Sequence, residues 1–194
     1  MTDQCALRDI AEIHQGYSFR EGVRHDPAGA VAVIQMRDLG DDGLVSLCGL
    51  DRVEMQLAER QRVIPGDILF RARGGSATSA IVAEDPGTAV AAAPLLRIRL
   101  SGDSVVPAYL SWYINQPPAQ AHFQRNAEGS NVKMISRRAL EALQIEIPGI
   151  ERQHAVVELA DLARREHALV RSIDGRRQQL LSEIMLRHVK GVGA

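Results

Sequence analysis

Residues 129–159 read GSNVKMISRRALEALQIEIPGIERQHAVVEL and hold a series of local structural signals. Ser136 is suited to cap a helix of about two turns over 137–143, because its hydroxyl can accept a hydrogen bond from an amide of the first turn. Residues 144–147 alternate polar and apolar side chains, which predicts a half-buried strand. Pro148 ends that strand, so the chain must turn before the next element.

A long helical pattern begins at Glu151 and continues almost to the C-terminus. Read in heptads, it has Glu166 and Arg176 as polar interruptions of an apolar a/d seam. The apolar a/d residues are Leu159, Leu162, Leu169, Ile173 and Leu180. At about 1.5 Å per residue the helix is roughly 60 Å long, and Gly175 is a candidate for a local break. We expect this helix to form a coiled coil with a partner helix; the alternative is that it folds back along its own domain.

The chain before residue 150 combines strand and helix patterns. The expected strands are 30–36, 68–72, 79–83 and one or two within 89–100, with further extended pieces at the end of 7–16 and at 131–135. The expected helices are 107–114, 119–126 and a short amphipathic one at 52–62. A β-rich middle flanked by helices predicts an α+β domain over 1–149, followed by the long helix over 150–190 and a tail over 191–194.

The composition is that of a globular domain. Hydrophobic residues make up 45% and charged residues 24% of the 194, and the formal net charge of −1 does not by itself indicate a nucleic-acid binder. No apolar run approaches the ~20 residues that span a membrane, and the N-terminus lacks a signal-peptide pattern, so we expect a cytoplasmic protein. Cys5 and Cys48 form no disulfide or zinc pattern and are expected to be reduced thiols.

The basic residues are almost all arginine: of 23, only Lys133 and Lys190 are lysine. Arginine presents a planar fork that suits phosphate groups and guanine edges, although a GC-rich genome explains this usage equally well. Strict alternation in 96–100 predicts that Arg97 and Arg99 lie on the face opposite the apolar side chains of that strand.

The sequence contains no recognisable catalytic or metal-binding motif. Neither lysine follows a carboxylate by two positions, as the Glu-x-Lys pattern of nucleases requires. Residues 115–118, Asn-Gln-Pro-Pro, depart from the Asn-Pro-Pro-aromatic motif of amino-methyltransferases, and residues 74–76, Gly-Gly-Ser, lack the Gly-Lys of a phosphate-binding loop. The six histidines show no metal-ligand spacing. We therefore expect no catalytic residue, metal or cofactor, while a Ser/His/Asp triad, which is recognised by geometry, stays open.

The junction between the predicted strand and the long helix carries Ile147, Pro148, Ile150, Glu151 and Gln153. This order resembles the end of a target recognition domain in the specificity subunits of type I restriction–modification systems, where a short strand, an Ile-Pro or Leu-Pro pair, a Glu/Gln pair and a long helix follow one another. Two further stretches match in order, LRDIAEIHQG at 7–16 and VIPGDILFRARGG at 63–75. The resemblance therefore spans nearly the whole chain.

The resemblance implies a non-catalytic protein that recognises a double-stranded DNA sequence and directs methyltransferase and restriction subunits to it. In that family two target recognition domains, each followed by a long helix, read the two halves of a split site, and the helices pair as an antiparallel coiled coil that docks the DNA methyltransferase subunits. This chain has one such unit. It is therefore expected to form a homodimer through its C-terminal helix, to pair with a second specificity chain, or to be a fragment. A homodimer would recognise a symmetric site.

Three polar loops bounded by glycine are the candidates for DNA contact, because they carry side chains that bind phosphates and base edges. The candidate residues are Ser18, Arg20, Arg24, Arg71, Arg73, Ser76, Thr78, Ser130, Asn131 and Lys133. For each arginine, a solvated or ion-paired surface position is an equally good interpretation. Two other functions stay open: a non-catalytic protein–protein adaptor of the same fold in a defence complex, and a small hydrolase without a visible motif. Deletion of 151–194 is expected to abolish self-association or partner docking while leaving the first domain folded; an unfolded truncation would instead show that the helix completes the core.

Overall fold

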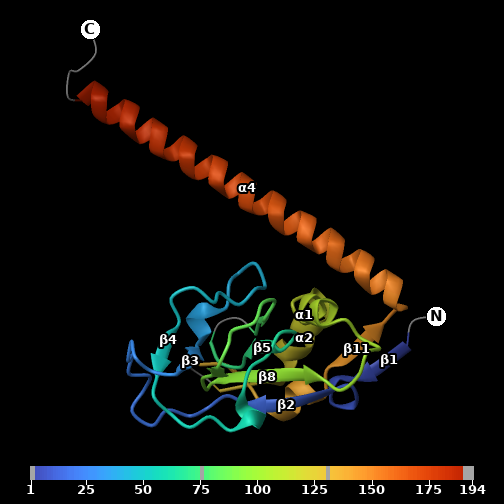
Figure 1. Ribbon diagram of the computed structural model, residues 1–194. Helices are drawn as coiled ribbons and strands as arrows, with labels where there is room; N and C mark the ends of the chain where they lie inside the picture. The colour runs from blue at the N-terminus through green and yellow to red at the C-terminus, as the bar shows by residue number, and fades with distance from the viewer. Residues whose placement is uncertain (1–2, 75–76, 130–131, 190–194) are drawn as a thin grey trace. The chain divides into compact units, whose positions relative to one another are not determined.

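The computed structural model describes residues 3–74, 77–129 and 132–189. Contacts between residues divide the chain into two units, Met1–Ala155 and Val156–Ala194 (Figure 1). The first unit combines sheets with short helices, and the second belongs to one long helix, so the predicted α+β class is confirmed. The domain boundary predicted at residue 149 stays a prediction, because the long helix starts at Ile150 within the first unit.

The largest sheet has four strands in the order β2-β8-β5-β6, and all its neighbouring strands are antiparallel. They are β2 (Ala11–Gln15), β8 (Leu95–Leu100), β5 (Ile68–Arg71) and β6 (Ser79–Ile81). Ile13 and Ile68 both pair with Ile98, and all three side chains are buried. This row of isoleucines favours the observed register, because a shift of one residue would turn each of them to the other face.

A second sheet has three strands, β4 (Asp51–Val53), β3 (Val31–Ile34) and β7 (Ala89–Ala91), with β3 in the middle. β3 is buried on both faces: Ala32 and Ile34 belong to one apolar cluster, and Val31 and Val33 belong to another. This explains the continuous apolar run that predicted the strand.

The amphipathic helix predicted over 52–62 is wrong. Its first residues form β4, where Val53 pairs with Val31, and only the short 3-10 helix η3 (Glu59–Gln61) follows. Strand pairing with a distant segment therefore overrides the weak helical pattern.

Three short helices complete the first unit: α1 (Pro107–Ile114), α2 (Pro117–Asn126) and α3 (Arg137–Glu141). Pro117 occupies the first helical position of α2, where a missing amide proton costs nothing, so this helix starts two residues before the prediction. Phe123 of α2 packs against Phe70 of β5, with ring centroids 5.0 Å apart. Both rings are buried and join the helix to the central sheet.

Asn115, which follows α1, binds the edge strand β6. Its Oδ1 accepts a hydrogen bond from the Ser79 amide at 2.8 Å, and its Nδ2 donates one to the Ser79 carbonyl at 2.9 Å. We expect Asn115→Ala to lower the free energy of unfolding by about 1–2 kcal/mol, because both peptide groups of Ser79 lose their partner. Urea denaturation would measure this. Gln116→Ala is the neighbouring control, and an equal loss there would show that the effect is not specific to the β6 contact.

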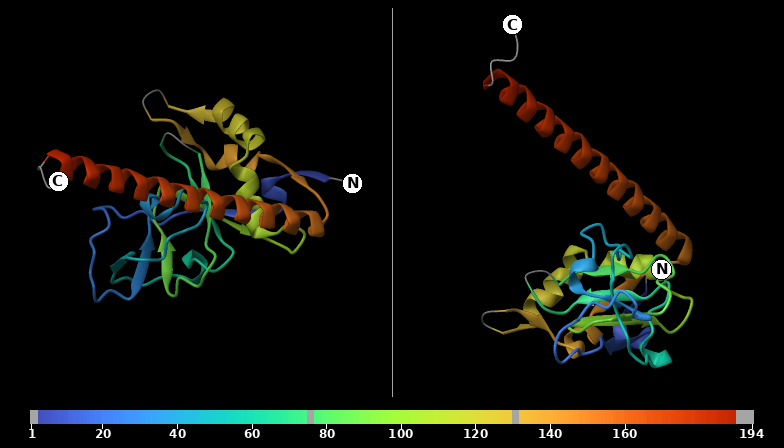
Figure 2. Two further views of the ribbon diagram at one scale, coloured as in Figure 1. Left: turned by 90° about the horizontal axis from the view of Figure 1, so that it is seen from above. Right: turned by 60° about the vertical axis from the view of Figure 1, so that its left-hand side comes forward.

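A short antiparallel pair, β9 (Ala127–Glu128) and β10 (Met134–Ile135), leads into α3. The Ser136 hydroxyl accepts a hydrogen bond from the Ala139 amide at 3.3 Å, so the predicted cap is confirmed, although α3 ends at Glu141 instead of residue 143. In both views of Figure 2 the yellow-orange segment that contains this pair lies at the margin of the first unit.

Strand β1 (Asp3–Ala6) pairs antiparallel with β11 (Gln144–Ile147) and places the start of the chain beside the segment that enters the long helix. The 3-10 helix η1 (Leu7–Asp9) then connects β1 to β2. As the alternation predicts, Ile145 is buried and Glu146 is exposed.

The long helix α4 (Ile150–Val189) has 40 residues and continues through Gly175 without a break, so the break proposed there does not occur. Its first turn belongs to the first unit, where Gln153 is fully buried. Further along, the predicted seam residues are all exposed, by 50–67%. They are Leu159, Leu162, Leu169, Ile173 and Leu180. Their role in dimerisation stays a prediction.

Candidate nucleic-acid interface

Arg73 and Lys133 come from two loops far apart in the sequence but lie at the same surface hollow. The Gly74 amide donates a hydrogen bond to the Lys133 carbonyl at 3.1 Å. The backbone of Arg73 pairs with that of Met134 in an isolated antiparallel β-bridge. The Ile135 amide also bonds to the Ala72 carbonyl at 2.8 Å. The hollow has a volume of about 310 Å³, and both basic side chains line it.

Arg73 and Lys133 form no ion pair with an acidic residue among those that the structure describes. Arg73 and Lys133 are exposed, and no hydrogen bond of either side chain links it to another described residue. Surface cations that are not committed to internal ion pairs can release counterions when they meet a phosphate backbone. The hollow thus has the electrostatics of an anion-binding surface.

Two side-chain amides from α2 also line this hollow, and neither was predicted as a site residue. Gln120 donates to the carbonyls of Ala77 at 2.8 Å and Ile114 at 2.9 Å, which fixes its orientation, whereas Gln124 is exposed. Glutamine presents a donor and an acceptor together, which is the pattern that reads adenine edges. On a helix such residues are indistinguishable from an ordinary solvated face until the tertiary structure is known.

Arg71 also lines this hollow, but its side chain is already engaged in the fold. Its guanidinium donates to the carbonyl of Met36 at 3.0 Å and to that of Leu39 at 2.6 Å, and the side chain is half-buried. Thr78 supports the same strand, because its carbonyl accepts a hydrogen bond from the Arg71 amide at 2.8 Å. Arg71 therefore positions the 3-10 helix η2 (Met36–Asp38), and any DNA contact of Arg71 or Thr78 stays a prediction.

Ser18 lines a second hollow, of about 350 Å³, together with Arg37 and Met36. Since the Met36 carbonyl is also the acceptor for Arg71, η2 connects the two hollows. Arg20 and Arg24 line neither of them, and Arg24 forms an exposed ion pair with Glu21 at 2.7 Å. Ser76, Ser130 and Asn131 lie outside the described residues.

An acidic residue keeps the second hollow close to neutral. Asp51 accepts a hydrogen bond from Gln35 at 2.8 Å and forms ion pairs with Arg37 and, at 3.3 Å, with His25. The Gln35 hydrogen bond, with a further contribution from Arg37, lowers the pKa of Asp51 below its usual value. A depressed folded-state pKa stabilises the fold above the unfolded value of about 3.9, and this contribution is lost as the pH falls through the folded value.

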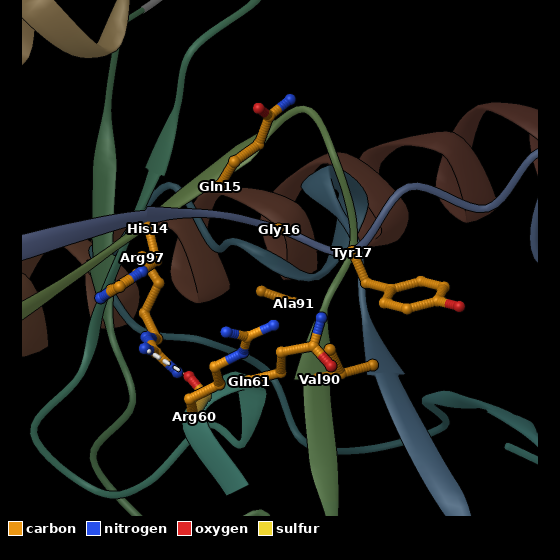
Figure 3. A pocket seen from close by; sticks show the side chains of 9 residues that line it. All are labelled: His14, Gln15, Gly16, Tyr17, Arg60, Gln61, Val90, Ala91 and Arg97. Carbon is orange, nitrogen blue, oxygen red and sulfur yellow. Dashed lines mark hydrogen bonds between the residues drawn. The ribbon is translucent and has the colours of Figure 1, made fainter. Parts of the chain in front are cut away.

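A third, smaller cavity of about 140 Å³ has Arg60, Gln61 and Arg97 among its lining residues (Figure 3). Arg97 is only 5% exposed and donates to the carbonyls of Arg60 at 2.9 Å and Arg62 at 2.8 Å. Burial lowers its pKa. Arg97 therefore serves the fold, because it holds the segment around η3 against β8.

Asp67 is the buried counter-ion of this arrangement. Both of its oxygens accept hydrogen bonds from Arg99 at 2.7 Å, and its Oδ2 lies 4.0 Å from the Arg97 Nε. The hydrogen bonds that Arg99 donates to the Asp67 carboxylate raise the pKa of Arg99. A buried carboxylate shared by two arginines is typical of a structural ion pair, so this cluster is not a recognition surface.

Within residues 3–74, 77–129 and 132–189 no group of three or more His, Cys, Asp or Glu side chains is arranged to hold a metal ion. None of the helices in these ranges has the length and hydropathy required to cross a membrane.

The fold is that of a target recognition domain followed by a long helix, as in type I restriction–modification specificity subunits. A chain from a structure of the complex assembly and conformational transition of the type I R-M system has a TM-score of 0.71 and 17% identity, over 94% of this chain and 43% of that one. The S subunit from M. genitalium has a TM-score of 0.62 and 10% identity, over 96% and 45%. The HsdS subunit from Thermoanaerobacter tengcongensis has values of 0.65 and 17%, over 96% and 44%.

The predicted resemblance is thus confirmed at the level of the fold. The chain spans less than half the length of each of these solved structures. No protein-family model matches the sequence, and no curated protein is significantly similar to it.

Proposed function

We propose that this protein is a non-catalytic specificity component of a type I restriction–modification system and that it recognises a double-stranded DNA sequence. The observation that carries the proposal is the shared fold, which extends over 94–96% of the chain. The hollow with Arg73 and Lys133 supports it, because unpaired basic side chains beside the exposed amide of Gln124 suit a contact with phosphates and base edges.

The proposed DNA-contacting set is centred on Arg73 and Lys133, with Gln124 added from α2. The other residues predicted from the sequence also stay proposed DNA contacts. They are Ser18, Arg20, Arg24, Arg71 and Thr78, together with Ser76, Ser130 and Asn131, which lie outside the described residues. The flanking loops contribute small polar groups and glycines, which let the backbone come close to a phosphate. The chain itself is proposed to supply neither a catalytic group nor a cofactor.

The proposed partners are a DNA methyltransferase subunit, a restriction subunit and a second copy of this chain. With one recognition domain, a homodimer through α4 supplies two half-site readers, and its two-fold symmetry requires a symmetric DNA site. The exposed apolar side chains of α4 support this assembly, since exposed apolar stripes of this length mark interaction surfaces.

Selection of bound duplexes from a random pool, with the full-length chain and with its co-purified methyltransferase, tests the proposal. We expect one two-part symmetric sequence to be enriched and its affinity to fall steeply with salt, by a factor of about 10³ or more between 50 and 200 mM if six or more phosphates are contacted. If no sequence is enriched in either form, the protein is not a DNA-specificity component.

The second candidate function is a protein–protein adaptor of the same fold, and the formal net charge of −1 favours it. An adaptor would capture the methyltransferase or another defence protein yet bind duplex DNA no better than that partner alone does. The same selection experiment with and without the partner therefore separates the two functions.

A further inference from the structure

The exposed apolar side chains of α4 recur every eleven residues. Leu159, Val170 and Leu181 form one series, Leu162, Ile173 and Ile184 a second, and Leu169 and Leu180 a third. All eight are 49–67% exposed. Eleven residues come within about 20° of three full turns of an α-helix, so these side chains form one nearly straight stripe. In a strict heptad frame, by contrast, Leu181 falls at a b position, away from the seam.

Two opposite charges lie in the middle of this stripe and are also separated by eleven residues. They are Glu166 and Arg177. Glu166 forms no ion pair with any described residue, and Arg177 has only an exposed contact with Asp174 at 4.0 Å. Exposed pairs of this kind contribute little to stability, so both charges can pair elsewhere.

We propose that this stripe binds the same stripe of a second copy in an antiparallel arrangement with Glu166 opposite Arg177 of the second copy. This rests on the self-association in the proposed function and specifies its register. The numbers of facing residues then sum to 343, and the two-fold axis passes between Arg171 and Ser172. The facing pairs are Leu159–Ile184, Leu162–Leu181, Ala163–Leu180, Glu166–Arg177 and Val170–Ile173, each formed twice.

Charge complementarity selects this arrangement over its alternatives. A parallel in-register pair would place Glu166 on Glu166 and Arg177 on Arg177, and like charges in a seam are unfavourable. Sliding the antiparallel pair by about one turn would place Glu166 opposite Ile173 or Leu181 and bury a charge against an apolar side chain. The heptad frame instead places Glu166 opposite Arg176. Substitutions at Arg176 and at Arg177 therefore distinguish the heptad register from the proposed one.

Sedimentation equilibrium of full-length variants tests the register. We expect Glu166→Arg and Arg177→Glu each to raise the dimer dissociation constant at least tenfold, because each creates two like-charge pairs. An equimolar mixture of the two single variants, and the double variant, should return to within about threefold of the unmodified chain, since every facing pair is then of opposite sign. Circular dichroism checks that the helix is intact.

Arg176→Glu is the matched control and should leave the dissociation constant within about threefold of its original value. If Arg176→Glu weakens the dimer while Arg177→Glu does not, the heptad register holds and the proposed one is overturned. If the unmodified chain dimerises but no variant changes its affinity, the interface lies elsewhere and the proposal is also overturned. An unmodified chain that stays monomeric refutes self-association itself, whereas DNA recognition is judged separately by duplex selection.

Discussion

Replacing Gln153 by alanine is expected to lower the free energy of unfolding by about 2–3 kcal/mol, although Gln153 lies in the first turn of a mostly exposed helix. The side chain is fully buried and makes three hydrogen bonds. Its Oε1 accepts from the Val106 amide at 2.8 Å, and its Nε2 donates to the carbonyls of Ser104 at 3.0 Å and Pro148 at 2.8 Å. Alanine would leave these partly buried backbone groups without a partner, and each such loss costs about 1 kcal/mol.

Gln153→Glu separates the two kinds of hydrogen bond at this position. A carboxylate keeps the acceptor for the Val106 amide but has no proton for the two carbonyls, so we expect an equal or greater loss of stability. Arg152→Ala, at the exposed neighbouring position, is the control and should change the unfolding free energy by less than about 0.5 kcal/mol. Urea denaturation monitored by tryptophan fluorescence measures all three, and an unchanged midpoint for Gln153→Ala would show that this link does not stabilise the domain.

The same contacts determine where the chain can be truncated. A chain that ends after Ala155 retains Gln153 and is expected to remain folded, whereas one that lacks 151–194 loses it and should be destabilised as Gln153→Ala is. A deletion that tests self-association should therefore end the chain after Ala155, so that a loss of assembly is not confused with a loss of stability. If both truncated chains have the same unfolding midpoint, the boundary predicted at residue 149 is adequate.

Local signals predicted the parts of the fold whose hydrogen bonds close within a few residues. The Ser136 cap depends on residues 136–139 alone and was predicted. The start of α2 at Pro117 has an equally local cause, its missing amide proton, but the helix was predicted only from residue 119. The predictions failed where a distant segment decides the outcome. Residues 51–53 are a strand because Val31 supplies the pairing partner, and no pattern within the segment itself contains that information.

Arg97 shows what a correct strand pattern leaves undetermined. The alternation that places it opposite Leu96 and Ile98 is real, but the segment around η3 covers that face, so that Arg97 is buried and bonded to the carbonyls of Arg60 and Arg62. Period-two alternation shows which side chains share a face of a strand. It does not show whether another segment packs over that face.

The candidate site was predicted as separate loops, and the fold joins two of them. Arg73 and Lys133 share one hollow because Met134 of β10 pairs with Arg73, just after the end of β5. The two paired segments are about sixty residues apart in the sequence. Gln124 was missed because an exposed glutamine on a helix carries no local signal. Arg71 was chosen correctly as a residue of this region, yet its hydrogen bonds to the carbonyls of Met36 and Leu39 could not be inferred from its neighbours in the sequence.

Removing both free cations of the hollow is expected to reduce affinity for the preferred duplex by about a thousandfold. A dimer carries two hollows, so Arg73→Ala with Lys133→Ala deletes four contacts, and at about 1 kcal/mol each the loss is about 4 kcal/mol. Because only the two Lys133 contacts of the dimer are expected to be to phosphate, the slope of log K against log salt should become shallower by about 1.8. Fluorescence anisotropy with labelled duplex at several salt concentrations measures both quantities.

The two single variants distinguish positioning from sequence reading. A phosphate contact is lost equally on preferred and scrambled duplexes, whereas a base contact is lost mainly on the preferred one. We expect Lys133→Ala to weaken both duplexes alike and Arg73→Ala to weaken the preferred duplex more, because the guanidinium fork suits a guanine edge. Arg8→Ala removes an exposed charge that lies near Asp9 and lines neither hollow, so it is the control for general electrostatics. Equal losses for Arg8→Ala and the double variant would mean that the hollow is not the DNA-binding surface, and the search would move to Ser18 and η2.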